Sequence, residues 1–319
     1  MGDTDAAFAA QAPRSADRHA FLKLLRQGVR AKVQSSELRG ATLAHRSPSS
    51  DHEDADNTKV AAFPSVAEHV HVPAWQTLVW RDAFSTEPFF EDTIGGRPLR
   101  IKQVLQGELN GFGTGLTVWP AACVLLKHLD HRVASSADAT PSFVIELGSG
   151  TGAVGVAAGM LMKSGRVVLT DMAKLEFIMR ANADAALSSI QHEHRQVAID
   201  VETYEWGSEP SEQLLPRQPG SNEREYPDLI LVSDCILPRL YPIEPLVEAL
   251  VMLCGPRTRV LISYEHRYYE HFQPKRRFWE LLKARGFTLR EIDENEYHPH
   301  YRADDIEIWE VSPPAAEDV

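Results

Sequence analysis

The chain has 319 residues, of which 43% are hydrophobic and 24% are charged, a composition typical of an ordinary globular protein. Its 45 acidic and 33 basic residues give a formal net charge of −12, which disfavours non-specific binding to nucleic acid. No apolar run reaches the roughly 20 residues of a membrane span, and the first residues lack the apolar segment of a signal peptide. The three cysteines have no metal-ligand spacing and indicate a reducing compartment. We therefore expect a cytoplasmic protein, with the nucleus as an alternative, that binds neither nucleic acid nor membranes.

Residues 1–60 are predicted to form a disordered tail. Ala, Ser, Asp and His dominate this segment, and residues 47–54 are poor in apolar side chains. Within the tail, residues 18–33 are basic and carry apolar residues close to helical spacing. Two interpretations stay open for this stretch: a short amphipathic docking helix, or a marginal helix without a function of its own.

Residues 61–313 are predicted to form one domain, with an N-terminal β extension at 61–140, a core at 141–313 and a short tail at 314–319. In the extension, residues 78–80 and 99–104 alternate as half-buried strands do, and Gly95 and Gly96 mark a turn. A helix is expected to begin near Pro120, because proline is favoured in the first helical turn.

Strand and helix patterns alternate from residue 143 to residue 311 and predict a doubly wound, mostly parallel sheet. The last two strands are joined only by residues 293–305, too few for a helical crossover, so they should pair antiparallel as a hairpin. The predicted fold class is α/β, with a Rossmann-like seven-strand sheet. The expected strands are 143–147, 166–171, 196–200, 228–234, 258–265, 287–292 and 306–311, and the expected helices are 152–163, 174–187, 243–253 and 274–285.

A glycine-dense turn, Gly148-Ser149-Gly150-Thr151-Gly152, follows the first of these strands. Such a turn lets a ligand approach the backbone, and the amides of the next helix point at that ligand. The same residues also fit a dinucleotide-binding pattern, which is weak evidence by itself. Glu146 favours another ligand, because a carboxylate beside the loop repels a pyrophosphate but suits a cationic group. S-adenosylmethionine carries such a group.

The first four predicted strands each end in a carboxylate. Because ligands bind at the carboxyl edge of a parallel sheet, these acids are expected to form an electronegative rim. One of them is placed to accept hydrogen bonds from ribose hydroxyls, and another could accept the adenine amine. Each could alternatively cap the helix that follows it. In chain order they are Glu146, Asp171 for the ribose, Asp200 for the adenine, and Asp234.

Residues 115–311 resemble the seven-strand (class I) S-adenosylmethionine-dependent methyltransferases, and within them the family-16 methyltransferase-like group of protein-lysine N-methyltransferases. The glycine loop is shared by nearly all such enzymes, whereas the tryptophan segments are more specific to this group. The matching motifs are Gly115-Leu-Thr-Val-Trp119-Pro-Ala-Ala, Glu146-Leu-Gly-Ser-Gly-Thr-Gly152, Leu169-Thr-Asp171, Glu205-Trp206-Gly207 and Leu229-Ile-Leu-Val-Ser-Asp234.

The resemblance implies S-adenosyl-L-methionine as cofactor and a lysine-bearing protein as substrate, bound by a monomer. Asp234 is the candidate catalytic residue, which would direct the acceptor amine. Group members modify different proteins, including elongation factors and chaperones, and the sequence does not identify the acceptor. The implied cofactor contacts are Trp119 at the methionine end, the loop residues Gly148, Ser149, Gly150 and Gly152, Asp171 at the ribose, Trp206 on the adenine side, and Ser233.

One departure from the group concerns the aromatic residue that many members carry three positions after the acid of the fourth strand. Here that position holds Leu237, and Tyr241 is the expected substitute. We expect a second wall of the substrate channel at the carboxyl edge of the fifth strand, where aromatic and charged residues gather in Tyr264-Glu265-His266-Arg267-Tyr268-Tyr269, with Tyr264, Glu265 and His266 as the main candidates.

Other functions remain open. Leu237 motivates a catalytically impaired protein that binds the cofactor and interacts with partners, and a small-molecule methyltransferase is a further alternative. A nicotinamide-dependent oxidoreductase is disfavoured by Glu146 and by the closing hairpin. No metal site is expected, because His192, His194, His298 and His300 lack the spacing of a ligand set.

Overall fold

A computed structural model describes residues 87–105, 114–135, 140–190, 196–218, 220–237, 243–267 and 273–314. The predicted tail, the basic segment 18–33 and the expected strand at 78–80 lie outside these ranges. In the described part of the chain, no helix is both long and apolar enough to cross a membrane.

The core is a seven-stranded sheet with the order β5-β4-β3-β6-β7-β9-β8. The strands from β5 to β7 pair in parallel, and β9 lies antiparallel between β7 and β8. The predicted fold class and its closing antiparallel hairpin are therefore confirmed. The strands are β3 (Phe143–Leu147), β4 (Ser164–Asp171), β5 (Gln196–Thr203), β6 (Leu229–Ser233), β7 (Arg259–Glu265), β8 (Thr288–Glu291) and β9 (Ile306–Ser312).

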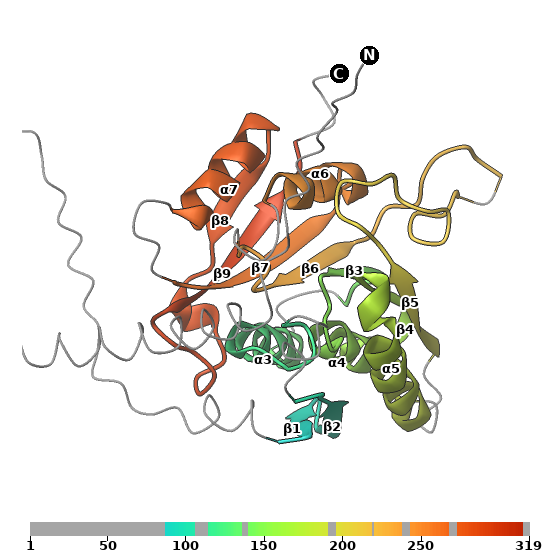
Figure 1. The fold of residues 1–319 in the computed structure, drawn as a ribbon, viewed down its shortest axis with the longest axis vertical. Helices are drawn as coiled ribbons and strands as arrows, with labels where there is room; N and C mark the ends of the chain where they lie inside the picture. Colours follow the sequence, from blue (N-terminus) through green and yellow to red (C-terminus); the bar gives the residue numbers. More distant parts are fainter. Residues whose placement is uncertain are drawn as a thin grey trace, which may run out of the picture.

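Helices cover both faces of this sheet (Figure 1). One face carries α3 (Pro120–Ala134), α4 (Ala153–Leu161) and α5 (Glu176–Ile190), and the other carries α6 (Ile243–Leu253) and α7 (Pro274–Ala284). Successive side chains of a strand point to opposite faces, so the inner strands contribute to two separate apolar cores, whereas the edge strands β5 and β8 each contribute to one. Two short 3-10 helices, η1 (Ala173–Leu175) and η3 (Glu294–Glu296), lie in the connections between these elements.

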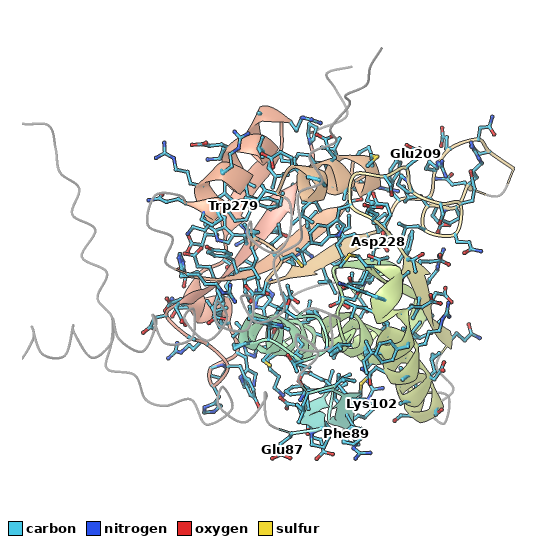
Figure 2. The ribbon with its side chains drawn as sticks, in the orientation of Figure 1. Glu87, Phe89, Lys102, Glu209, Asp228 and Trp279 are labelled. Atoms are coloured by element: carbon cyan, nitrogen blue, oxygen red, sulfur yellow. The ribbon has the colours of Figure 1, made fainter. Side chains whose placement is uncertain are left out.

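A small hairpin packs outside α4 and α5, with Phe89 and Lys102 at its ends (Figure 2). It consists of β1 (Phe89–Ile94) and β2 (Arg97–Lys102), joined by Gly95 and Gly96 at φ of 57° and 74°. The predicted turn is confirmed, and β1 and β2 lie within the predicted β extension. Asn182 on α5 holds the hairpin, because its amide accepts from Lys102 N at 2.7 Å and donates to Thr151 O at 2.8 Å. The hairpin is thereby joined to the glycine loop.

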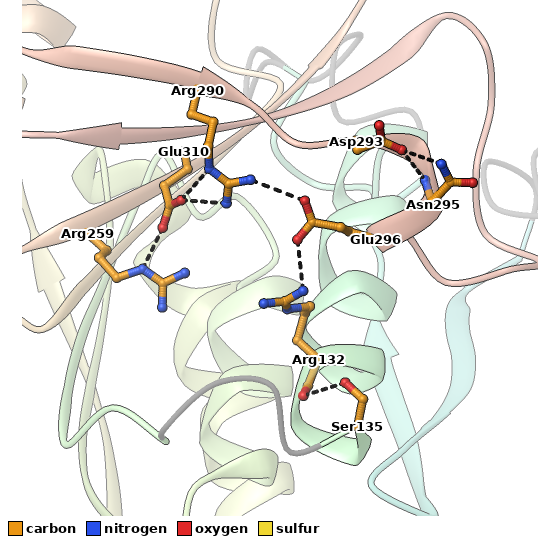
Figure 3. A network of polar contacts seen from close by, with 8 residues as sticks. All are labelled: Arg132, Ser135, Arg259, Arg290, Asp293, Asn295, Glu296 and Glu310. Atoms are coloured by element: carbon orange, nitrogen blue, oxygen red, sulfur yellow. Dashed lines mark hydrogen bonds and ion pairs between the residues drawn. The ribbon is translucent and has the colours of Figure 1, made fainter.

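A network of charged side chains ties β8 and β9 to α3 (Figure 3). Glu310 on β9 accepts from Arg259 at the start of β7 and from Arg290 on β8, both at 2.6 Å. Glu296 in η3 then accepts from Arg290 at 3.1 Å and from Arg132 on α3 at 2.8 Å. This chain of ion pairs lies where β7 begins, at the opposite end of the strand from the carboxyl edge.

Candidate active site

The glycine loop after β3 has a backbone that only glycine adopts readily. Gly148, Gly150 and Gly152 have φ of 65°, 56° and 79°, in the left-handed region. A Cβ on Gly148 would lie 2.6 Å from the Sγ of Cys235 and 2.9 Å from the indole of Trp206. The loop is therefore in close contact with the segments that follow β5 and β6.

Ser149 fixes this loop to the neighbouring strand. Its amide donates to Thr170 O and its hydroxyl accepts from Thr170 N, both at 2.9 Å. The hydroxyl also donates to Glu146 O at 3.1 Å. Since the side chain is engaged within the protein, a ligand at this position would meet the backbone of the loop.

Asp171 is the last residue of β4, and it lies against the glycine loop. One carboxylate oxygen accepts from Gly150 N at 2.8 Å and the other accepts from Met172 N at 2.7 Å. Burial raises the pKa of this carboxyl, and the two amide hydrogen bonds partly offset that rise. The structure thus brings Asp171 and the loop together at the predicted edge of the sheet.

The two predicted tryptophans approach the loop from opposite faces of the sheet. Trp119 precedes α3, and its indole N–H donates to Thr114 O at 2.9 Å. The neighbouring Gly115 packs on Gly150, whose Cβ, if present, would lie 2.6 Å from Gly115 O. Trp206 covers Gly148 and packs against the core on the α6 and α7 face. Both tryptophans are half-buried, Trp206 against the loop itself and Trp119 in the segment whose Gly115 meets it.

Asp234 directly follows β6 and is the only non-glycine residue with positive φ, 56°, among the described residues. Aspartate tolerates this region better than most residues, but the conformation still carries strain and is often found at functional sites. Ser233, half-buried before it, lies opposite Ser263 on β7. The strand end is therefore held in an unusual conformation at the carboxyl edge.

The partner of Asp234 was not predicted. Arg267 donates from Nη1 to Asp234 Oδ1 at 2.6 Å, and its Nη2 donates to the second carboxylate oxygen. The same guanidinium contacts Glu265 Oε2 at 3.1 Å and lies 5.4 Å from the ring of Trp119. The sequence did offer one signal for this contact. Arg267 is a basic residue just after a predicted strand, and the end of that strand was expected to lie near several acids.

The predicted rim of four carboxylates is wrong for two of them. Glu146 is 1% exposed, and its Oε2 accepts from Gly155 N at 3.0 Å under the start of α4, away from the mouth of the loop. Asp200 lies in the middle of β5, which continues to Thr203, and it pairs with Arg166 at 3.2 Å. The expected strand end at Asp200 is therefore three residues too early.

The structure also separates the residues that were expected to form the second wall of the substrate channel. Tyr264 and Glu265 are adjacent in β7 and point to opposite faces, as strand geometry requires. Tyr264 packs in the core beside α7, with its ring 5.3 Å from that of His266, which pairs with Glu307. Only Glu265 joins Asp234 and Arg267. Tyr241 lies outside the described residues.

Metal binding finds no support in the described part of the chain. No group of three or more His, Cys, Asp or Glu side chains there is arranged to hold a metal ion. His298 and His300 are neighbours with ring centroids 5.9 Å apart, whereas His192 and His194 fall outside the described ranges.

The sequence is similar to known proteins over most of this domain. The pattern of the family described as lysine methyltransferase matches residues 97–285. Protein-lysine N-methyltransferase EFM6 of Saccharomyces cerevisiae is 29% identical over 213 residues, covering 62% of this chain and 81% of that protein. EEF1A lysine methyltransferase 3 of Xenopus tropicalis is 31% identical over 193 residues, covering 59% and 72%. The solved glycopeptide N-methyltransferase MtfA, complexed with S-adenosyl-L-methionine, is 12% identical with a TM-score of 0.42, covering 59% of this chain and 94% of that chain.

Proposed function

This chain belongs to the lysine methyltransferase family and is an S-adenosylmethionine-dependent protein-lysine N-methyltransferase, and we propose that its active site is the carboxyl edge of β3, β4 and β6. The observation that carries this location is the contact of the glycine loop with Asp171 on one side and with Trp206 and Cys235 on the other. Here a loop of glycines in the left-handed region meets a half-buried carboxylate at the end of a parallel strand.

The residues present fit the cofactor. A side chain at Gly148 would clash with Cys235 and Trp206, and one at Gly150 would clash with Gly115. Glycine at both positions therefore lets the neighbouring segments close on the loop. Asp171 already accepts two amide hydrogen bonds, but a carboxylate offers about four acceptor sites, so it can also accept from ribose hydroxyls. Met172 follows it with an exposed apolar side chain that suits the flat face of adenine. We assign Trp119 to the methionine end of the cofactor, Trp206 to the adenine side, and Ser233 to the cofactor contacts at the end of β6.

Bound S-adenosylmethionine supplies a methyl group on a positively charged sulfur. The protein has to present an unprotonated lysine amine in line with that methyl group. A free lysine has a pKa near 10.4, and burial between aromatic and apolar side chains lowers it. We assign Asp234 and Glu265 to the acceptor side of the site, where their carboxylates direct the amine. Tyr264 and His266 are not part of this assignment, because Tyr264 packs in the core on the opposite face of the sheet and His266 pairs with Glu307.

The acceptor is proposed to be a lysine of another intracellular protein. The frog relative is named for EEF1A, and a protein acceptor of that kind fits the acidic surface, because a net charge of −12 favours a basic partner. A second candidate function is cofactor binding without turnover. It is motivated by Leu237, a 3% exposed aliphatic residue at the position where many group members carry an aromatic one.

One experiment separates these two candidates. The purified chain is incubated with S-adenosylmethionine carrying a labelled methyl group and with an extract of cells that lack this protein. We expect label on lysine in one or a few proteins, and mass spectrometry of the same proteins from cells with and without this chain should show the corresponding loss. Cofactor binding without any labelled lysine would favour the second candidate.

The proposed cofactor site makes a prediction for two aspartates. Asp171→Asn should weaken S-adenosylmethionine binding by about 10- to 100-fold, because hydrogen bonds to a charged group contribute about 1.5–3 kcal/mol. Asp200→Asn is the matched control, since Asp200 is exposed in mid-strand and pairs only with Arg166 among the interactions described above. Isothermal titration calorimetry measures both. Equal losses in the two variants, or unchanged binding in Asp171→Asn, would contradict the site.

A further inference from the structure

We propose that Arg267 is a positioning residue of the methyltransferase reaction, which aligns Asp234 at the acceptor side with Trp119 at the cofactor side. The inference rests on the proposed location of the active site. Arg267 lies two residues beyond β7, whereas Asp234 follows β6 and Trp119 precedes α3. A single guanidinium thus joins three elements at the edge where methyl transfer takes place.

The geometry of this contact is specific to arginine. Two nitrogens of the guanidinium meet the two oxygens of Asp234, with Nη1 to Oδ1 at 2.6 Å. Nη1 also donates to Glu265 O at 3.0 Å, and Nη2 contacts Glu265 Oε2 at 3.1 Å. A lysine ammonium is a point charge and does not reproduce a planar, two-nitrogen contact of this kind.

Burial makes the contact rigid. The side chains of Arg267 and Asp234 are 6% and 2% exposed, so water scarcely competes for their hydrogen bonds. Asp234 additionally accepts from Glu265 N at 3.4 Å, and its positive φ requires outside support. The guanidinium supplies that support and holds the carboxylate in one orientation.

Charged groups of both signs meet at Arg267. Two carboxylates, Asp234 and Glu265, face one guanidinium, which in turn lies over the face of the Trp119 indole, 5.4 Å from its centroid. Methyl transfer moves positive charge from the sulfur to the acceptor amine, so carboxylates fixed on the acceptor side favour the product ammonium more than the bound sulfonium. Removing Arg267 would leave two like charges close together and release the orientation of Asp234.

The test uses full-length protein and the acceptor identified by labelling in extract. Arg267→Ala should lower kcat/KM for that acceptor by on the order of 100-fold, the loss expected when a reacting group moves by about 1 Å. Affinity for S-adenosylmethionine should fall by less than about tenfold, because the glycine loop and Asp171 are untouched. Low concentrations of guanidinium chloride, far below its denaturing range, should restore part of the activity, and equal sodium chloride should not.

Two further variants keep the outcome decisive. Arg267→Lys retains the charge without the two-nitrogen contact and should still lose at least about tenfold in kcat/KM with an unchanged melting temperature. Arg276→Ala, an exposed arginine paired only along α7 with Glu280 among its described ion pairs, is the control and should behave as wild type. Wild-type activity in Arg267→Ala or Arg267→Lys would overturn the proposal. The proposal would also be overturned if Arg267→Ala lost activity only in proportion to its loss of folded protein and guanidinium did not restore that activity. An inactive wild type would instead refute the proposed function.

Discussion

Glu146 is a carboxyl group that the fold keeps almost wholly from water. Burial raises its pKa to about 8, although the amide of Gly155 and the side chain of Ser149 act in the opposite direction. The group is therefore largely protonated near neutral pH in the ligand-free protein. Its contribution to the site is to hold the start of α4 against the glycine loop, and it is not a fixed charge opposite the cofactor.

This pKa predicts how the free energy of unfolding depends on pH. Because the folded pKa of about 8 exceeds the unfolded value of 4.5, the contribution of Glu146 is fully present below pH 4.5. It is lost as pH rises toward 8, by at most about 1.4 kcal/mol per pH unit. Glu146→Gln mimics the protonated form and should remove this slope. Urea unfolding of both proteins at pH 5, 6, 7 and 8 measures it, and a difference that is constant with pH would contradict the assignment.

At the scale of elements, the ion pairs around Glu310 hold the closing hairpin against α3. Burial alone would raise the pKa of Glu310, but hydrogen bonds from Arg290 and Arg259 outweigh it and lower that pKa. The carboxylate is thus favoured in the folded state. Glu310 on β9 thus links side chains of β7 and β8 through two ion pairs, in addition to the backbone pairing of these strands.

The hairpin network makes its own prediction. Glu310→Gln should lower the free energy of unfolding by about 1–2 kcal/mol at neutral pH, because hydrogen bonds to charged groups contribute about this much. The loss should shrink at acidic pH, where the carboxylate of the unfolded chain is protonated, and at high salt. Glu280→Gln removes an exposed ion pair along α7 and should change stability by less than about 0.5 kcal/mol. Equal effects of both substitutions in urea unfolding would count against the network.

The elements that sequence patterns predicted well are those with continuous apolar runs. β3 and β6 are buried along most of their length and read as apolar runs between turn residues. β1 was not predicted, because Glu91, Asp92 and Thr93 interrupt it, and it becomes a strand only by pairing with β2. β5 was cut short because Asp200 was interpreted as a strand end. It is in fact the exposed member of the alternating residues of an edge strand, between buried Ile199 and Val201.

The edge that carries the site could be predicted from the sequence, whereas the directions of its side chains could not. Strand order brings Asp171 to the glycine loop, and that contact follows from the fold alone. The contact between Asp234 and Arg267 depends on how two loops leave neighbouring strands, 33 residues apart in the chain. A pattern of residue types carries no information on such a pairing. The same limit applies to Glu146, whose depth is set by the packing of α4 on β3.

At the scale of the whole molecule, the proposed site draws residues from 119 to 267 and from both faces of the sheet. A ligand that binds there should therefore stabilise the domain as one cooperative unit. S-adenosylmethionine at 100 times its dissociation constant adds about 2.7 kcal/mol, which for a domain of this size raises the melting temperature by about 5–10 °C. A nicotinamide dinucleotide should leave the melting temperature unchanged. Asp171→Asn should reduce the shift at equal ligand concentration, and Asp200→Asn should keep it. If thermal unfolding were biphasic and the ligand raised the melting temperature of only one phase, the ligand would stabilise only one face of the sheet. The proposed site would then be limited to residues of that face.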